Sequence, residues 1–277
     1  MSEFHPDLDS YFVRIGLDGP RAPTGDFLSR LVSLHQRTIA FENLTSFSGG
    51  VVTLDPAAVE NKLIRDGRGG YCHEQNSYLR LVLMALGFEV KLRMARVRWM
   101  QPPDATPQRG HMMLNVAAEG VWYLCDVAFG AMTPTMPLRL DTEQPQETPH
   151  QTYRLVRVAD ARHLEVKLGD FWRPVYSFDD VDHHPVDFEA ANWLVSTHPS
   201  SEFVRTLVVA RPTPDERRIL NNRTLSFRRS DGTVEKKMLL DIGELRSTLT
   251  TMFGIALPVD ATTTNALQRL FETGTRS

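Results

Sequence analysis

Cysteine is scarce in this sequence, with only Cys72 and Cys125 among 277 residues. Two thiols cannot build a disulfide framework, and they are too few for a structural zinc site without help from histidine. No apolar run approaches the roughly 18 residues that a membrane-spanning helix needs. Residues 1–6 also lack the basic and apolar segments of an export signal. These absences predict a cytoplasmic protein with no membrane association and no bound metal.

An excess of positive charge is also missing, since 31 basic residues face 34 acidic ones and the formal net charge is −3. This balance excludes the strongly basic surface that is typical of proteins that bind nucleic acid or anionic membranes. The apolar content of 42% and the charged content of 23% are typical of a globular enzyme. The length predicts two or three structural units.

Hydrophobic periodicity divides the chain into three parts and predicts an α+β fold. Residues 1–87 have mostly helical spacing, with Thr24 and Asp55 at helix-capping positions. From residue 88 the period changes to two, which predicts an antiparallel sheet or small barrel, including a strand over residues 121–128. Residues 191–277 mix helices with strands, including a strand over residues 204–210 and a hairpin around residues 230–232. The predicted domains are 1–87, 88–190 and 191–277.

Three glycines precede Cys72, at positions 67, 69 and 70, and an apolar, helix-like run follows it up to Gly87. This order places Cys72 in the first turn of a helix, where unpaired backbone N–H groups and the helix dipole favour a negative charge. A thiol in that position ionises more easily, and the thiolate is the reactive form. We therefore interpret Cys72 as a nucleophile.

A base for this nucleophile is predicted on the hairpin that contains His111 and Asp126. If residues 117–120 form a four-residue loop, His111 lies directly opposite Asp126, close enough for an imidazole to meet a carboxylate. A two-residue turn would leave the two side chains diagonal but still on one face, whereas a three-residue loop would separate them. In the first two cases Asp126 orients His111, which takes the proton of Cys72, as in a serine triad with sulfur as the nucleophile.

Four segments of the sequence resemble the motifs of one enzyme family, in the same order and at matching separations. They are residues 41–44 (Phe-Glu-Asn-Leu), 68–76 (Arg-Gly-Gly-Tyr-Cys-His-Glu-Gln-Asn), 109–111 (Arg-Gly-His, with Leu114 and Val116) and 126–130 (Asp-Val-Ala-Phe-Gly). This family is the arylamine N-acetyltransferases. The sequence departs from the family pattern at His73, where phenylalanine is more usual, at Gly110 and at Ala128.

The resemblance implies a fold of three parts, namely an N-terminal helical bundle, a central antiparallel β-barrel and a C-terminal α/β lid, with a core like that of cysteine proteases. It selects the same catalytic residues, Cys72, His111 and Asp126. It also implies a ping-pong reaction in which acetyl-CoA acylates the cysteine, and an aromatic amine or hydrazine then takes the acetyl group. Such a protein would serve xenobiotic metabolism.

The resemblance further implies which molecules the protein binds. Acetyl-CoA is a co-substrate, and no cofactor stays bound. The family's acceptor cleft is lined at positions that correspond to Phe41, Phe129, Gly130 and Phe203. Aromatic walls suit a flat arylamine. The resemblance is compatible with a monomer or a homodimer.

Three other functions use parts of the same pattern. A related enzyme could use a different acyl-CoA or act as an amide synthase that closes a macrolactam. A thiol hydrolase of the papain or transglutaminase kind would use the same triad with water, a peptide or a lysine as the acceptor. A binding module could retain the fold without catalysis.

Overall fold

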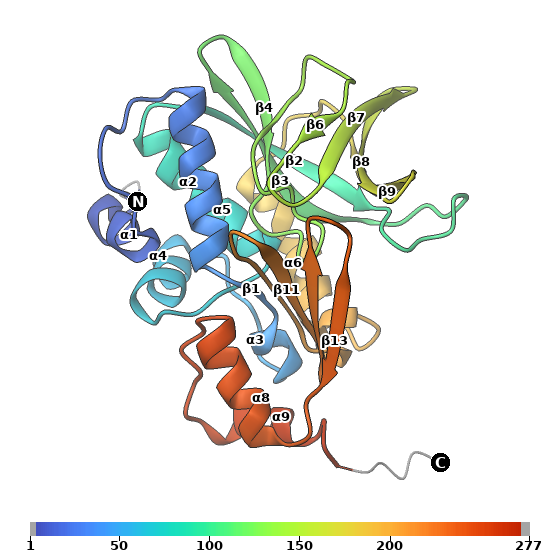
Figure 1. Ribbon diagram of the computed structural model, residues 1–277. Coiled ribbons are helices and arrows are strands. Elements are labelled where there is room, and N and C mark those ends of the chain that lie inside the picture. The colour runs from blue at the N-terminus through green and yellow to red at the C-terminus, as the bar shows by residue number, and fades with distance from the viewer. Residues whose placement is uncertain (1–3, 273–277) are drawn as a thin grey trace.

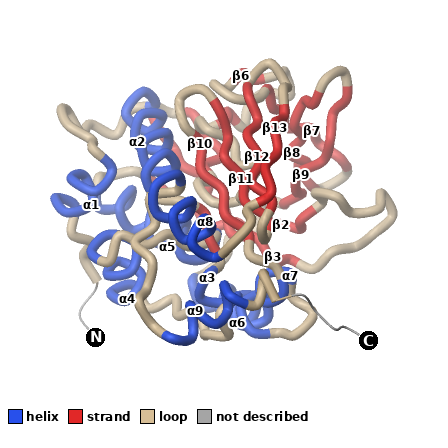
Figure 2. Tube along the Cα trace, turned by 60° about the horizontal axis from the view of Figure 1, so that its bottom comes forward, coloured by secondary structure: helices blue, strands red, loops and turns tan. Residues whose placement is uncertain are grey.

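The computed structural model describes residues 4–272, which form two β-sheets with helices packed beside them (Figure 1). In Figure 2 the helices gather toward one side of the molecule, and most strands lie on the other. The mixed helix-and-sheet class predicted from the sequence is therefore confirmed.

The N-terminal part of the chain is helical. Its helices are α1 (Leu8–Ile15), α2 (Gly25–Thr38), α3 (Leu44–Phe47), α4 (Pro56–Glu60), which continues as a π-helical turn over Asn61–Arg65, and α5 (Cys72–Ala85). Both predicted caps are present, because the side chains of Thr24 and Asp55 accept hydrogen bonds from backbone N–H groups of the helices that follow them. Helix α5 ends as predicted, with Gly87 just after it at a φ of 87°.

Eight strands form one antiparallel sheet in the order β5-β4-β3-β2-β9-β8-β7-β6. They are β2 (Glu89–Val97), β3 (Arg109–Ala118), β4 (Val121–Cys125), β5 (Leu138–Arg139), β6 (Gln146–Glu147), β7 (Thr152–Val158), β8 (Ala161–Leu168) and β9 (Phe171–Phe178). The two edge strands meet where the Gln146 side chain bonds the N–H and the C=O of Arg139, at 2.8 and 3.0 Å. The sheet is thus a nearly closed barrel.

The turn that joins β3 to β4 is shorter than the four-residue loop that would pair His111 directly with Asp126. Ala118 pairs with Val121, so the turn consists of Glu119 and Gly120 alone. Both residues have positive φ, 50° and 79°, as in the two-residue turns whose twist matches that of the strands. The prediction of a four-residue loop is therefore wrong, and the two-residue alternative is confirmed.

The strand predicted over residues 121–128 is also too long. The pairing of β3 with β4 ends at Leu114 and Cys125, so Asp126 lies just beyond the last paired residue. The Asp126 backbone carbonyl accepts a hydrogen bond from the Gln36 side chain at 3.2 Å, and its carboxylate accepts one from the N–H of Ala128 at 3.0 Å. These bonds replace those of the sheet.

A second antiparallel sheet, in the order β1-β10-β11-β12-β13, joins a strand from the N-terminal part of the chain to four strands from its C-terminal part. Its strands are β1 (Phe41–Glu42), β10 (Val208–Pro212), β11 (Glu216–Asn221), β12 (Thr224–Arg229) and β13 (Val234–Met238). The accompanying helices are α6 (Glu189–Thr197), α7 (Glu202–Arg205), α8 (Ile242–Ser247) and α9 (Ala261–Gln268). Because β1 pairs with β10, Phe41 lies opposite Ala210 and close to the C-terminal part of the chain.

Two details of the C-terminal part differ from the sequence prediction. The strand expected over residues 204–210 begins only at Val208, because Ser201 caps the short helix α7. Strand β11 has no counterpart in the prediction, since charged residues such as Arg217 interrupt its apolar pattern. Arg217 is nevertheless buried, and its guanidinium donates to Gln151 at 2.6 Å. The hairpin around residues 230–232 is confirmed between β12 and β13.

No helix in residues 4–272 is both long and apolar enough to cross a membrane. Within the same residues, no three His, Cys, Asp or Glu side chains come together in a group that could hold a metal ion.

Candidate active site

Cys72 is the first residue of α5, and a closely packed loop leads into it. Gly69 packs so closely on the preceding segment that a Cβ atom there would lie 2.1 Å from the carbonyl oxygen of Ala40. Only glycine fits at this position. The Tyr71 N–H donates to the carboxylate of Glu74 at 3.1 Å, which satisfies one backbone group at the helix start. The thiol of Cys72 therefore lies at a helix N-terminus, and its residue is 5% exposed.

His111 and Asp126 form a buried pair beside this helix. The His111 Nε2 lies 2.7 Å from the Asp126 Oδ2, and the two residues are 3% and 1% exposed. Because Nε2 contacts Asp126, Nδ1 is the ring nitrogen on the side of Cys72. The diagonal placement that the two-residue turn predicts is thus sufficient to join the imidazole to the carboxylate.

The contact between His111 and Asp126 shifts the pKa values of both groups. Burial alone would lower the pKa of His111, but the Asp126 carboxylate, the Cys72 side chain and hydrogen bonds to both raise it to about 10. Burial would likewise raise the pKa of Asp126, yet the His111 charge and several hydrogen bonds hold it below its usual value. At neutral pH the site therefore contains an imidazolium next to a carboxylate, with Cys72 on the other side of the ring.

Asn76 supports this pair, and the sequence reasoning did not assign it that role. One turn after Cys72, its Nδ2 donates to the Asp126 Oδ1 at 3.0 Å and to the Met112 carbonyl at 2.8 Å, and its Oδ1 accepts from the Val127 N–H at 3.1 Å. Asn76 thus connects the helix of the thiol with β3 and with the segment that follows β4. The only sequence signal was its position in the same motif as Cys72.

A cleft of about 830 Å³ opens beside these residues. Cys72 and His111 both lie on its wall, whereas Asp126 lies behind His111 and does not border it. All four residues expected to contact substrate also line this cleft, namely Phe41, Phe129, Gly130 and Phe203. The Phe41 and Phe203 rings meet edge to face at 5.8 Å, and the Phe129 ring lies edge to face with His111 at 5.0 Å.

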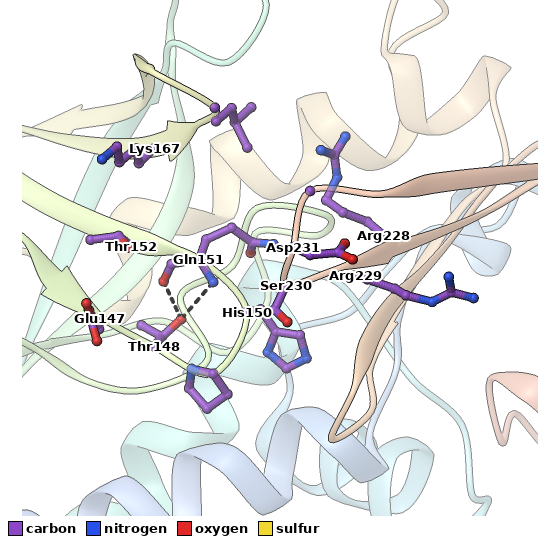
Figure 3. Close-up of a pocket in the computed structure, with 14 residues that line it drawn as sticks. Glu147, Thr148, His150, Gln151, Thr152, Lys167, Arg228, Arg229, Ser230 and Asp231 are labelled. Atoms are coloured by element: carbon purple, nitrogen blue, oxygen red, sulfur yellow. Dashed lines mark hydrogen bonds between the residues drawn. The ribbon is translucent and has the colours of Figure 1, made fainter.

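A second cavity, of about 600 Å³, lies between the barrel and the hairpin of β12 and β13 (Figure 3). Its walls carry Lys167 from the barrel and Arg228 and Arg229 from β12. On another side of the cavity, the Thr148 hydroxyl donates to the Gln151 carbonyl at 2.7 Å and accepts from the Gln151 N–H at 3.3 Å. None of the residues that line it contains a thiol. Cys72, His111 and the aromatic walls therefore belong to the other cleft.

His73 follows the cysteine and is fully buried. Neither of its ring nitrogens has a hydrogen-bond partner, and it packs edge to face against Tyr71 and Phe188 at 5.7 and 6.0 Å. Burial and the nearby His111 charge lower the pKa of His73 to about 3, so the ring is neutral.

We expect His73→Phe to raise the free energy of unfolding by about 1–2 kcal/mol, because it removes two buried polar atoms that bond nothing. Urea denaturation measures the change. His35→Phe is the matched control, since the His35 ring is equally buried but contacts the hydroxyl of Tyr11 at 2.9 Å and the Gln75 side chain at 3.0 Å. That variant should be less stable than the parent. Equal losses of stability in both variants would contradict the argument.

The raised pKa of His111 also predicts how its stabilising effect depends on pH. The imidazole binds its proton with a pKa of about 10 in the folded protein and about 6.5 in the unfolded chain. Its contribution to stability is therefore complete below pH 6.5 and disappears as the pH rises through 10. The difference in unfolding free energy between the parent and His111→Gln should shrink between pH 6.5 and pH 10. A difference that stays constant over this range would contradict a raised pKa.

Comparison with known proteins gives consistent matches over most of the chain. A family model described as N-acetyltransferase matches residues 25–262. The arylamine N-acetyltransferase of Mycobacterium tuberculosis is 43% identical over 253 residues, which cover 90% of this chain and 89% of the relative. The solved structure of Mycobacterium marinum arylamine N-acetyltransferase in complex with CoA has a TM-score of 0.91 at 39% identity, covering 95% of this chain and 99% of that one. A more distant relative, the N-malonyltransferase FDB2 of Fusarium pseudograminearum, is 30% identical over 232 residues, 72% of this chain and 67% of its own length.

Proposed function

This chain belongs to the arylamine N-acetyltransferase family, and on that basis we propose that it transfers the acetyl group of acetyl-CoA through Cys72 to the nitrogen of an aromatic amine or hydrazine. The observation that carries the proposal is the cleft whose wall holds both Cys72 and His111, with Asp126 bonded behind the ring. Acetyl-CoA is the proposed co-substrate, because the M. marinum relative was solved in complex with CoA.

In the first half-reaction His111 holds the proton that Cys72 gives up. The thiolate attacks the thioester carbonyl of acetyl-CoA, a new C–S bond forms, and the bond to the CoA sulfur breaks. CoA leaves with the proton that His111 returns, so the enzyme is left as an uncharged acetyl thioester. Both thioesters are of similar energy, and the step therefore needs no external driving force.

In the second half-reaction the neutral amine attacks the acetyl group on Cys72. His111 accepts a proton from the amine through Nδ1, while Asp126 stabilises the imidazolium that results. The C–S bond breaks, and the proton returns to the sulfur or remains on the ring. The backbone N–H of Cys72, in the first turn of α5, is suited to stabilise the oxyanion of both tetrahedral intermediates.

We also propose that the C-terminal part of the chain acts as a lid over this cleft. The wall of the cleft includes side chains from α6, α7, β10 and β11, namely Leu194, Phe203, Val208 and Ile219. A helix that presents the thiol to a histidine on an antiparallel barrel is the arrangement of cysteine proteases, and we propose the same relation for this core. A lid would exclude water and so favour transfer over hydrolysis.

The test is incubation with acetyl-CoA alone, followed by addition of aniline or benzhydrazide. We expect one acetyl group per protein, located on Cys72 by mass spectrometry, and then acetylated amine in the second phase. Hydrolysis is the second candidate, because water can replace the amine. Continuous release of CoA without any acetylated amine would establish a thiol hydrolase instead.

A further inference from the structure

A third cavity, of about 570 Å³, lies against the barrel on the side of β2 that faces away from the catalytic cleft. Successive residues of a strand point to opposite faces of the sheet. Val97 and Trp99 accordingly line the catalytic cleft, whereas Arg96 and Arg98 line the third cavity. The two cavities share no lining residue, so the third one is a separate site.

Three arginines line this cavity, and two of them have no ionic partner. Arg96 lies directly opposite Arg109 in the pairing of β2 with β3, and like charges in that arrangement destabilise a sheet. The Asp179 carboxylate forms an ion pair with Arg109. No carboxylate in residues 4–272 forms an ion pair with Arg96 or Arg98. Two uncompensated positive charges therefore lie side by side, which is the arrangement expected where an anion binds.

The loop after β2 holds both of these guanidiniums in place. Nη1 of Arg96 donates to the Pro107 carbonyl, and Nη1 of Arg98 donates to the Ala105 carbonyl, both at 2.7 Å. The Nε of Arg98 also lies 3.4 Å from the Ser177 hydroxyl. Within the part of the chain that the structure describes, Nη2 of Arg98 and both Nε and Nη2 of Arg96 bond nothing. Three donor nitrogens on two fixed side chains can thus bind a ligand at little cost in side-chain entropy.

The other titratable groups of the cavity do not cancel these charges. Asp160 is exposed on the turn between β7 and β8, where water and salt screen its carboxylate. Burial and the charge of Arg98 lower the pKa of His163, so this ring is neutral at pH 7. The cavity therefore keeps a positive potential, and a neutral imidazole can add one N–H donor.

The charge and the size of the cavity indicate the kind of ligand. A phosphate monoester carries close to two negative charges and three acceptor oxygens, which match two guanidiniums with free N–H groups. Cavities of roughly 300–1,000 Å³ are typical of small-molecule sites. The rest of the wall includes apolar side chains that can cover the organic group of such a ligand, namely Met94, Pro103, Val158, Ala159 and Ala161.

We propose that this cavity binds a small phosphate monoester, with the phosphate on Arg96 and Arg98 and the organic group against the apolar side chains. The inference goes beyond acetyl transfer and does not depend on it, because none of these residues borders the catalytic cleft.

The test is isothermal titration calorimetry of the whole protein with phenyl phosphate and with inorganic phosphate, at an ionic strength held constant with chloride. We expect phenyl phosphate to bind with a Kd on the order of 1 mM or lower. It should bind at least about threefold more tightly than inorganic phosphate, because its ring makes apolar contacts. No saturable binding of phenyl phosphate, or equal affinity for the two ligands, would overturn the proposal.

Two arginine variants locate the binding site. Arg96→Gln removes one of the two uncompensated charges and should weaken the binding of phenyl phosphate by about tenfold. Arg30→Gln is the matched control, because Arg30 also donates to a backbone carbonyl, that of Asp18 at 2.9 Å, but lies outside the cavity. Its affinity should stay within about twofold of the parent. Equal weakening in both variants would contradict the proposal, because the lost charge would then act without belonging to the site.

Asp160→Asn tests the same site with the opposite sign. It removes the cavity's other negative charge, the one outside the ion pair of Asp179, and should tighten the binding of phenyl phosphate by about threefold. The change is made on an exposed turn, so it tests the proposal even if Arg96→Gln does not fold. Unchanged or weaker binding in Asp160→Asn would contradict the inference. A parent protein that binds phenyl phosphate but acetylates no arylamine would overturn the proposed function alone.

Discussion

Cys72→Ser is expected to lower kcat for acetyl transfer by a factor on the order of 10⁴ or more, with folding intact. The hydroxyl is smaller than the thiol and needs no extra room at the buried helix start, so the fold should accept it. The hydroxyl, however, does not give up its proton to His111 as a thiol does, and the reaction then has no anionic nucleophile. Steady-state kinetics with acetyl-CoA and an arylamine measures the loss.

Cys125→Ala is the control for this experiment because it removes the other thiol. Cys125 is fully buried on β4, opposite Leu114, and burial raises the pKa of its thiol well above the usual value. We expect the alanine variant to keep acetyl transfer within about threefold of the parent, with some loss of stability from the cavity. Substantial turnover by Cys72→Ser, or covalent acetyl label on Cys125, would contradict covalent catalysis at Cys72.

The sequence predicted the local elements around the site because their signals are local. The position of Cys72 follows from the glycines before it and the apolar helix after it, and the structure places it at the start of α5. The approach of His111 to Asp126 follows from strand periodicity, since only the parity of the turn decides whether the two side chains share a face. The contact of the helix with the hairpin does not follow from local signals, and the structure provides it through Asn76.

The features that the sequence did not predict depend on contacts between distant segments. The role of Asn76 appears only when α5 lies against β3, because each of its three bonds crosses from the helix to the hairpin. The pairing of β1 with β10 joins residues about 170 positions apart, as in Phe41 and Ala210. Strand β11 was missed because the charged Arg217 is buried through its own hydrogen bonds, which the hydrophobic pattern does not record.

The boundaries between the three parts of the chain, at residues 87 and 190, stay a prediction. So do the catalytic roles of Cys72, His111 and Asp126 and the substrate contacts of the aromatic residues. The catalytic role of Asp126 can be tested by replacing it with asparagine. This change keeps the shape of the side chain but alters where the protons of the site lie.

Asp126→Asn should lower kcat by roughly 10⁴-fold, which is the size of effect seen when the same change is made in a serine triad. The reason lies in the donors around the carboxylate. Oδ1 accepts from Asn76 Nδ2 and from the Ala128 N–H, both at 3.0 Å, so the oxygen of an asparagine must take that place. Its amide NH2 group then faces His111 Nε2 and donates to it. That nitrogen can no longer carry the proton, which moves to Nδ1, the nitrogen on the side of Cys72.

A ring with its proton on Nδ1 cannot accept a second one from the thiol, so the nucleophile stays uncharged. The same change removes the carboxylate that most strongly raises the pKa of His111, and the imidazolium is lost at neutral pH. Alkylation of Cys72 by iodoacetamide at pH 7 should therefore slow together with acetyl transfer, which a purely structural defect with a normal thiolate would not produce. Asn76→Ala removes one donor but leaves the carboxylate charged, so it should slow both reactions much less than Asp126→Asn. A folded Asp126→Asn protein that alkylates and turns over at the parental rate would refute the role of the carboxylate.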